Sequence, residues 1–123
     1  MLRNNFYSII TTENLGEERQ KARIRLNAAH SIFAGHFPEM PVVPGVCMLQ
    51  ILKEFTEEKV QANLQLAKSP TIKFLSMLQP EKDPEIDLDI EVRPTEAGQY
   101  QVKGSLSSAS ATFLKFKGNF HEQ

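Results

Sequence analysis

One stretch of this sequence, residues 33–52, combines groups that are suited to acid–base chemistry. An unperturbed imidazole titrates near neutral pH, so His36 is able to take up or release a proton during a reaction. Three prolines follow it, Pro38, Pro41 and Pro44, and each restricts its own backbone and that of the preceding residue. The loop is therefore expected to be rigid and to hold the imidazole in one place.

A helix is expected to begin directly after this loop, at Pro44-Gly45. Proline suits the first helical turn because the N–H that it lacks would have no partner within the helix. Glycine has no side chain that would keep a second molecule away from the neighbouring N–H groups. Free N–H donors and the positive end of the helix dipole stabilise negative charge on an oxygen atom. The start of the helix is therefore a candidate oxyanion site beside His36.

The expected helix, from about residue 45 to near residue 63, has an apolar first half. Every residue of Val46–Leu52 is apolar except Gln50, and a helix that is apolar on all sides is expected to be buried on all sides. The second half is polar, with Phe55 directed inward. A buried amide without a hydrogen-bond partner costs about 1–3 kcal/mol. Gln50 is therefore expected to face a cavity or a ligand, or else a neighbouring backbone group in the core.

The loop and the helix start resemble the signature of the hotdog-fold 3-hydroxyacyl-acyl-carrier-protein dehydratases in Gly35-His36-Phe37-Pro38, Pro41 and Pro44-Gly45-Val46. The resemblance implies that His36 removes a proton from C2 of the substrate. It also implies that a backbone N–H of Gly45 or Val46 holds the thioester carbonyl. In that family a Glu or Asp stands fourteen residues after the histidine and faces the partner chain's histidine across a dimer. This sequence has Gln50 at that position.

An amide neither gives nor takes a proton near neutral pH, so Gln50 cannot act as the acid of that family. It can still position a water molecule or the substrate hydroxyl, and it is therefore the second candidate catalytic residue beside His36. Glu54, one helical turn further on the same face, is an alternative carboxylate, whereas Glu39 is expected to be solvated. A different hypothesis makes the chain a partner subunit whose His36 faces the carboxylate of an active homologue.

The resemblance also implies a tunnel for the acyl chain beside the helix and a substrate that arrives on a phosphopantetheine arm. The carrier of that arm is an acyl carrier protein or coenzyme A. Carrier proteins are acidic, so basic side chains near the tunnel mouth are expected to help, and the available ones are Arg23, Arg25, Lys73 and Lys115. The residues expected to line the tunnel are Phe33, Phe37, Val42, Met48 and Leu49.

The rest of the sequence predicts strands. The clearest is Ile86–Val92, where apolar and acidic residues alternate with a period of two. Two strands, one long apolar helix and an antiparallel meander predict an α+β fold with a curved sheet wrapped around the helix. The resemblance names this the hotdog fold and implies that an exposed edge strand is paired in a homodimer, a larger even-numbered oligomer or a heterodimer with an active homologue. The expected strand ranges are 6–10, 21–28, 69–78, 86–92, 100–106 and 111–120.

Length and composition set further bounds. A chain of 123 residues with a net charge of −1 is expected to form one domain, residues 1–123, without nucleic-acid binding. The single cysteine, Cys47, excludes an intrachain disulfide and fits a reducing compartment. No apolar run is long enough for a membrane span and no signal peptide is recognised, so we expect a cytoplasmic protein. We expect no cofactor and no metal, because no third ligand accompanies His30 and His36; His30 is interpreted as structural.

By this resemblance the chain is expected to be a dehydratase-like protein of fatty-acid or polyene synthesis. It would remove water from 3-hydroxyacyl thioesters linked to an acyl carrier protein and give trans-2-enoyl thioesters. The alternative is a non-catalytic hotdog subunit that binds acyl chains or completes a partner's active site. A thioesterase is a third hypothesis, since other hotdog enzymes hydrolyse thioesters with a carboxylate and a helix N-terminus. The missing acid at position 50 counts against this hypothesis as much as against the dehydratase.

Overall fold

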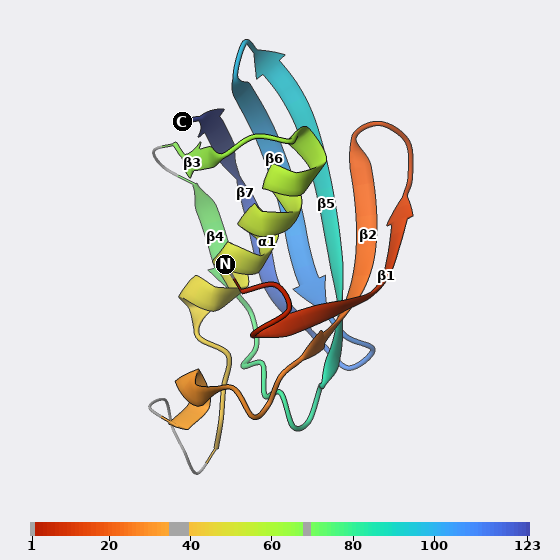
Figure 1. Ribbon diagram of the computed structural model, residues 1–123, viewed down its shortest axis with the longest axis vertical. Coiled ribbons are helices and arrows are strands. Elements are labelled where there is room, and N and C mark those ends of the chain that lie inside the picture. Colours follow the sequence, from red (N-terminus) through yellow and green to blue (C-terminus); the bar gives the residue numbers. More distant parts are fainter. Residues whose placement is uncertain (1, 35–39, 68–69) are drawn as a thin grey trace.

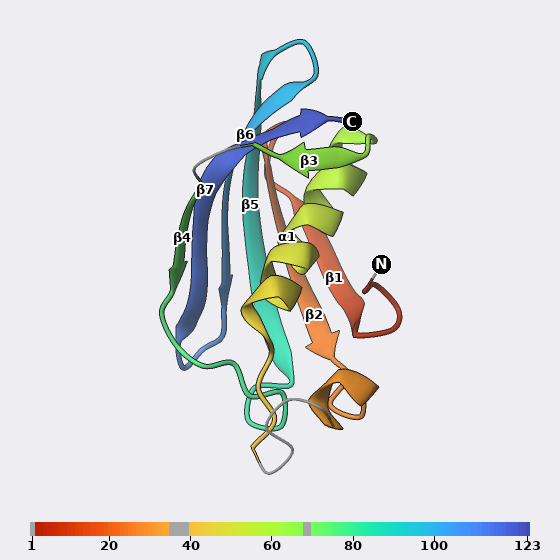
Figure 2. The same ribbon diagram turned by 90° about the vertical axis from the view of Figure 1, so that its left-hand side faces the viewer.

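A seven-stranded antiparallel sheet curves around a single α-helix in the computed structural model of the protein (Figures 1 and 2). The structure describes residues 2–34, 40–67 and 70–123. The arrangement confirms the predicted α+β class and the hotdog fold, in which one helix packs along the concave face of the sheet. The expectations for His36, Phe37 and Glu39 lie outside the described residues.

The elements follow the predicted order of two strands, a helix and a meander, with one short unpredicted strand, β3, added after the helix. Across the sheet the order is β1-β2-β5-β6-β7, and both β3 and β4 pair with the outer side of β7. The bounds are β1 Tyr7–Asn14, β2 Arg19–Leu26, the 3-10 turn η1 Ser31–Ala34, α1 Gly45–Val60, β3 Leu64–Leu66, β4 Thr71–Phe74, β5 Glu85–Glu96, β6 Gln99–Ser107 and β7 Thr112–Glu122.

Strand β5 shows most clearly how the sequence builds the two faces of the sheet. The four apolar residues of Ile86–Val92 are buried, as the period of two predicts. Two of the acidic residues between them pair with arginines of β2. Asp87 lies 2.9 Å from Arg23, and Asp89 lies 2.7 Å from Arg19. The concave face therefore forms the core, and the outer face at β2 and β5 is a charge-paired surface.

The middle of α1 supplies the centre of the core. Ile51, Leu52 and Phe55 are at most 2% exposed, which confirms the inward direction predicted for Phe55. Gly104 of β6 lies beneath Leu52, and a Cβ atom added to it would lie 3.3 Å from both Leu52 methyl groups. The missing side chain at this position lets the helix approach the sheet closely.

The first turns of α1 are less buried than the sequence predicted. Val46 is 74% exposed, while Leu49 and Gln50 are half-buried. The prediction that this apolar half is buried on all sides is therefore wrong for the chain on its own. The sheet covers one side of the helix, and the opposite side of the first turns carries apolar side chains to the surface.

Several element bounds also differ from the predictions. Strand β1 continues to Asn14, beyond the predicted end at Ile10, because its second half still pairs with β2. The helix ends at Val60, before Gln61, which adopts a left-handed conformation with φ of 56°. The strand expected over residues 69–78 is limited, in its described part, to Thr71–Phe74. Strand β3 was not predicted, since three residues carry too little pattern.

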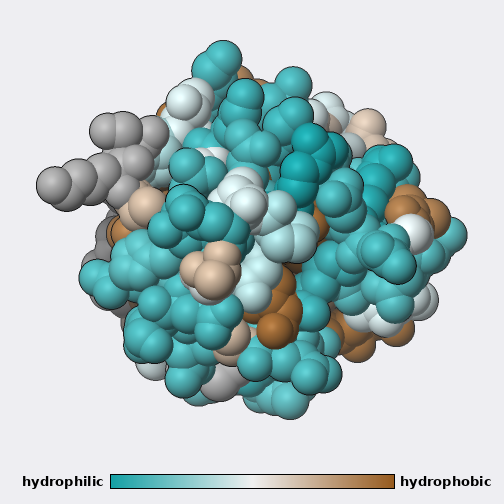
Figure 3. Space-filling view, turned by 90° about the horizontal axis from the view of Figure 1, so that it is seen from above, coloured by the Kyte–Doolittle hydropathy of each residue, from teal (hydrophilic) through white to brown (hydrophobic). Residues whose placement is uncertain are grey.

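The surface differs between the two ends of the molecule. The end that carries the β5–β6 turn and the C-terminus is covered mainly by hydrophilic residues (Figure 3). A group of exposed apolar side chains lies near the start of α1. It consists of Val46, of Phe74 at the end of the edge strand β4, and of Leu75 and Met77 directly after that strand. Groups of exposed apolar residues on a protein commonly mark interaction sites. No helix in the described part of the chain is long and apolar enough to cross a membrane.

Candidate active site at the start of the helix

The first turn of α1 presents two backbone N–H groups that have no partner inside the helix. Pro44 occupies the cap position with φ of −61° and ψ of 146° and forms no side-chain cap. Hydrogen bonding to the Pro44 carbonyl begins with the N–H of Cys47, at 3.0 Å. The N–H groups of Gly45 and Val46 precede that bond and are free of intrahelical partners. This is the arrangement that an oxyanion site at a helix start requires.

The aromatic ring of Phe74 lies against the start of the helix. A Cβ atom added to Gly45 would lie 2.7 Å from Phe74 Cζ, which is closer than two carbon atoms can pack. Position 45 therefore requires glycine as long as the ring stays in place. Phe74 itself is 52% exposed, so the ring is held by one side only.

Two grooves border this turn, and they divide the residues expected to line the acyl-chain tunnel. Gly45 and Val46 are neighbours in sequence, yet each lies in a different groove. The larger groove, of about 480 Å³, is lined by Val42, Val43, Gly45, Met48 and residues 74–78. The smaller, of about 150 Å³, is lined by Val46, Leu49, Gln50, Leu52, Lys53, Leu66, Phe116 and Phe120.

Gln50 is tied to the carboxylate of Glu54, one turn further along α1. The Gln50 side-chain nitrogen donates to Glu54 Oε2 at 2.8 Å. Residues four apart on a helix face the same side, which is why the two side chains meet. The Gln50 amide is therefore held by a side chain. One of the two sequence interpretations placed it in the core with a backbone group as its partner, and the structure shows a carboxylate partner instead.

Glu54 is 2% exposed and accepts three further hydrogen bonds. The backbone N–H of Leu2 donates to Oε2 at 2.8 Å. The N–H of Arg3 and the hydroxyl of Tyr7 donate to Oε1 at 3.0 and 3.1 Å. Glu54 thus anchors the N-terminal segment to the middle of the helix. Both of its oxygens already accept two hydrogen bonds each, so Glu54 is poorly placed to act as the alternative acid.

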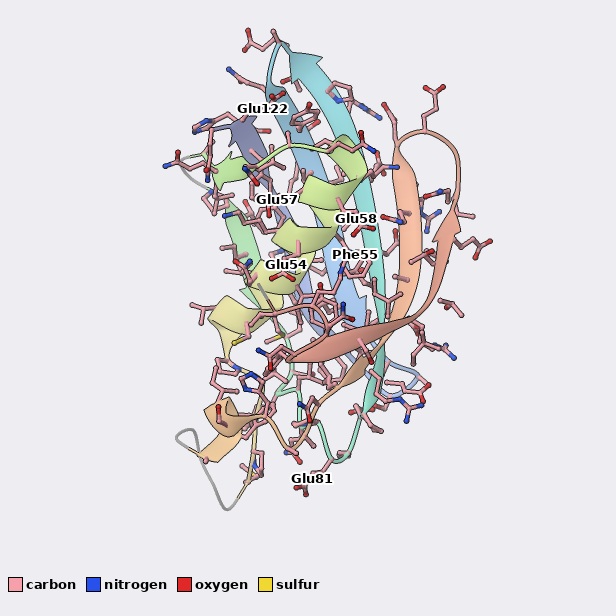
Figure 4. All side chains as sticks on the ribbon, in the orientation of Figure 1. Glu54, Phe55, Glu57, Glu58, Glu81 and Glu122 are labelled. Atoms are coloured by element: carbon pink, nitrogen blue, oxygen red, sulfur yellow. The ribbon has the colours of Figure 1, made fainter. Side chains whose placement is uncertain are left out.

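Three other glutamates, Glu57, Glu81 and Glu122, are no better placed than Glu54 to act as the acid. Glu81 and Glu122 lie toward opposite ends of the molecule, away from Glu54 (Figure 4). Glu57 accepts from the backbone N–H of Leu64 at 2.8 Å and so fastens the segment that follows the helix. Each of these carboxylates is separate from the first turn of α1.

Arg3 and Tyr7 complete a buried cluster around Glu54. Arg3 pairs with Glu58, and its guanidinium carbon lies 4.7 Å from the centre of the Phe55 ring. Among the described residues, Arg3 Nε and Nη2 have no hydrogen-bond partner although both are buried. Burial is the main reason that the pKa of Tyr7 is raised to about 12; Glu54 acts in the same direction and Arg3 opposes it. The Tyr7 hydroxyl therefore stays protonated and remains a donor to Glu54.

The remaining sequence-predicted residues lie elsewhere. Phe33 is buried and stacks on Phe6 with 5.4 Å between the ring centres, so it belongs to the core below the grooves. His30 Nδ1 accepts from the backbone N–H of Ile32 at 3.1 Å, which agrees with its structural interpretation. Burial raises the pKa of the Cys47 thiol, as expected for an unreactive cysteine.

The sequence interpretation missed the contribution of the N-terminal segment. Leu2, Arg3 and Tyr7 lie about fifty positions from Glu54, and no local pattern links them. The one available signal was Glu54 itself, an acidic residue on the same helical face as the only polar residue of the apolar half. In residues 2–34, 40–67 and 70–123, no group of three or more His, Cys, Asp or Glu side chains is placed to hold a metal.

The strand order, the single helix and the open first turn define a hotdog-fold protein. Residues 12–117 match the ApeI-like family, described as the ApeI dehydratase. The match extends over most of the chain, and the chain belongs to this dehydratase family. A comparison with curated protein sequences finds no match.

Solved structures show the same fold. The dehydratase heterocomplex ApeI:P from Xenorhabdus doucetiae aligns with a TM-score of 0.67 at 20% identity, covering 93% of this chain and 96% of the other. A conserved protein of Pseudomonas aeruginosa gives 0.66 at 11% identity, covering 97% and 90%. A hypothetical thioesterase of Streptococcus pneumoniae with coenzyme A gives 0.65 at 8% identity, covering 95% and 85%. At these identities the likeness shows the fold alone.

Proposed function

We propose that this chain acts in the dehydration of 3-hydroxyacyl thioesters. In this reaction a base removes a proton from C2, the C3–O bond breaks, and a double bond forms between C2 and C3. The departing hydroxide takes up the proton that the base has removed from C2, and it leaves as water. The products are a trans-2-enoyl thioester and water, so no oxidant, reductant or cofactor is consumed.

His36 is the proposed base, because it stands in the family signature and an imidazole exchanges protons near neutral pH. The backbone N–H groups of Gly45 and Val46 are the proposed donors to the thioester oxygen, on which negative charge builds as C2 loses its proton. Gln50 is proposed to bind the 3-hydroxyl group. The acyl chain is proposed to lie along the apolar grooves beside the first turn of α1.

The observation that carries this proposal is the first turn of α1. Its two N–H groups, which have no partner inside the helix, lie between two largely apolar grooves, and the half-buried Gln50 is one of the residues that line the smaller groove. A thioester needs donors for its oxygen, and its acyl chain needs apolar surface. The membership of the chain in a dehydratase family supports the same reaction class.

A second candidate function is that of a partner subunit, and the amide at position 50 favours it. Glu54, the nearest carboxylate of the helix, is already occupied by four donors. The acid would then come from a second chain that covers the exposed Val46 and the free edge of β4. An apolar surface of this kind suits a subunit interface, and the Xenorhabdus relative is itself a heterocomplex.

A basic surface supports an acidic acyl carrier protein as the proposed substrate donor. Four lysines project from the outer face of β4, β6 and β7 around a groove of about 480 Å³. Lys103 lies opposite Lys117, and Lys73 lies opposite Lys115, so like charges meet across each strand pair. Among the described residues, none of the four forms an ion pair, whereas the arginines proposed for the same role are neutralised by acidic residues of β5.

The test is a dehydration assay on the purified protein with a 3-hydroxyacyl-carrier-protein substrate, in which the mass of the acyl group is followed. The proposal expects loss of one water molecule and a rate that falls about 100- to 10,000-fold in His36→Ala, the usual contribution of a general acid–base residue. If the chain alone is inactive but becomes active with a second hotdog chain that carries Glu or Asp at the matching position, the partner-subunit function is the correct one.

A further inference from the structure

We propose that Glu54 is a positioning residue for Gln50, and that it makes position 50 a hydrogen-bond acceptor for a hydroxyl group on the acyl chain. The inference rests on the proposed function, because it names the group of the substrate that the site recognises. It adds a second residue, remote from the groove, to the recognition of that group.

Glu54 accepts one hydrogen bond from each of four neighbouring groups. Oε2 accepts from the N–H of Leu2 and from the Gln50 amide, each at 2.8 Å. Oε1 accepts from the N–H of Arg3 and the hydroxyl of Tyr7. The backbone N–H groups of Leu2 and Arg3, one on each carboxylate oxygen, are able only to donate. The arrangement therefore accommodates the ionised carboxylate, which accepts hydrogen bonds and donates none.

The ionised carboxylate fixes the direction of the Gln50 amide. The nitrogen and oxygen of an amide have nearly the same shape, so the partner decides which of them faces it. An ionised Glu54 accepts hydrogen bonds and donates none, so the nitrogen of Gln50, which is the donor end of the amide, faces Glu54. The carbonyl oxygen, Gln50 Oε1, is then held at the opposite edge of the amide group, pointing away from Glu54. A free glutamine would present either atom with similar ease.

The remaining question is which group donates a hydrogen bond to Gln50 Oε1. Gln50 lines the smaller groove, where the other lining residues are apolar except Lys53. No side chain or backbone group of the described residues donates to Gln50 Oε1. A hydroxyl group on an aliphatic chain supplies the missing donor, whereas a methylene at the same place leaves the oxygen unpaired. Leaving a polar group unpaired is costly, so the groove favours the hydroxylated chain.

The consequence separates recognition from proton transfer. A carboxylic acid at position 50 is able to donate a proton to the departing hydroxyl, whereas an amide oxygen held by Glu54 only accepts from it. Glu54 and Gln50 together therefore select the 3-hydroxyacyl thioester without acting as its acid. Selectivity for the hydroxyl group is then independent of how fast the protein turns the substrate over.

The test compares the affinities of two ligands that differ by one hydroxyl group, the amide analogues of 3-hydroxyoctanoyl-pantetheine and octanoyl-pantetheine, measured by calorimetry on the full chain. An amide replaces the thioester so that C2 is too weakly acidic for dehydration during the measurement. The wild type is expected to bind the hydroxylated ligand about five- to tenfold more tightly, the factor that one hydrogen bond commonly contributes. Glu54→Gln is expected to lower this ratio to near one, because a neutral amide at position 54 no longer fixes the direction of Gln50. A purely structural role of Glu54 would weaken both ligands equally and leave the ratio unchanged.

Glu58→Gln is the matched control. Glu58 lies one turn beyond Glu54 on the same helix and pairs with Arg3, but it does not contact Gln50. This variant is expected to keep the wild-type ratio. Equal binding of the two ligands by the wild type, or an unchanged ratio in a folded Glu54→Gln, overturns the inference and leaves the proposed function standing. Failure of both ligands to bind overturns the proposed function and the inference with it.

A second measurement covers the case in which Glu54→Gln does not fold. The side-chain carbonyl carbon of Gln50 is followed by NMR in wild-type protein labelled at glutamine, with each ligand in turn. The hydroxylated ligand is expected to shift this resonance, and the octanoyl ligand is expected to leave it near its ligand-free position. The same shift with both ligands contradicts the inference.

Discussion

The side-chain nitrogen of Gln50 lies 2.8 Å from Glu54 Oε2, so the only polar residue in the apolar half of the helix is joined to its one buried carboxylate. Gln50 reaches the groove beside the first turn of α1, and Glu54 reaches the N-terminal segment. Through this contact, the start of the chain supports a side chain at the candidate active site.

The contact predicts that Glu54 is important for stability. In Glu54→Ala, four donors lose their acceptor at once, among them the backbone N–H groups of Leu2 and Arg3. We expect a loss of about 3 kcal/mol in the free energy of unfolding, measured by urea denaturation, because buried donors without partners are costly. Glu81→Ala, on an exposed loop, is the control and is expected to change stability by less than about 0.5 kcal/mol. Equal effects of the two substitutions would show that the cluster contributes little.

A second prediction concerns the contact between Gly45 and Phe74. Gly45→Ala introduces a Cβ atom at 2.7 Å from the ring, which must move or strain the helix start. We expect a destabilisation of about 1–3 kcal/mol in the wild-type background. Alanine is intrinsically the better helix former. The same substitution is therefore expected to be neutral or stabilising when combined with Phe74→Ala. A double-mutant cycle measures this coupling, and strictly additive effects would contradict it.

The raised pKa of Tyr7 predicts a loss of stability at high pH. An unfolded tyrosine ionises near pH 10, whereas Tyr7 in the folded protein has a pKa of about 12. Between these values the folded state holds a proton that the unfolded state has released, so stability falls as the pH rises. Below pH 10 this contribution is constant. Denaturation curves between pH 9 and about 12 are expected to show a shallower decline in Tyr7→Phe than in the wild type, and identical slopes would count against the shift.

The lysine surface predicts a selective effect on carrier-linked substrates. Lys103→Glu combined with Lys117→Glu reverses the charge at the centre of this surface. We expect the KM for a 3-hydroxyacyl-carrier-protein substrate to rise about tenfold or more, because the attraction to an acidic partner becomes repulsion. The KM for the corresponding pantetheine thioester, which has no protein carrier, is expected to stay the same.

A matched control for this prediction lies on the neighbouring part of the outer face. Lys21→Glu changes the charge of β2 by the same kind of substitution, away from the four lysines around the groove. It is expected to leave both KM values near those of the wild type. Equal increases for both substrates in the double variant would indicate damage to the site rather than loss of carrier docking.

Much of the fold was predictable because it depends on local patterns. The alternation in Ile86–Val92 predicted a half-buried strand, and the structure places it at the centre of the sheet. Pro44-Gly45 predicted the start of the helix, which begins at Gly45. Strand β3 was not predictable, because its three residues form a strand only by pairing with β7.

The apolar first half of the helix shows where sequence reasoning failed. The apolar side chain of Val46 led us to expect that it is buried. The sequence did not indicate whether residues of this chain or of another molecule bury it. Val46 is 74% exposed, so the described part of the chain does not supply that cover. The partners of Glu54 were hidden for a related reason, since contacts over about fifty positions depend on the whole fold.

The most direct test of the proposed function is the rate of dehydration of 3-hydroxyoctanoyl-pantetheine by the wild type and by Gln50→Glu, measured side by side. The small thioester removes carrier docking from the comparison. We expect a measurable rate in the wild type and a rate at least tenfold higher in Gln50→Glu, because a carboxyl group at position 50 adds a general acid to the same site. Absence of turnover in both proteins, with each correctly folded and binding the thioester, would contradict the proposal that this chain acts in dehydration.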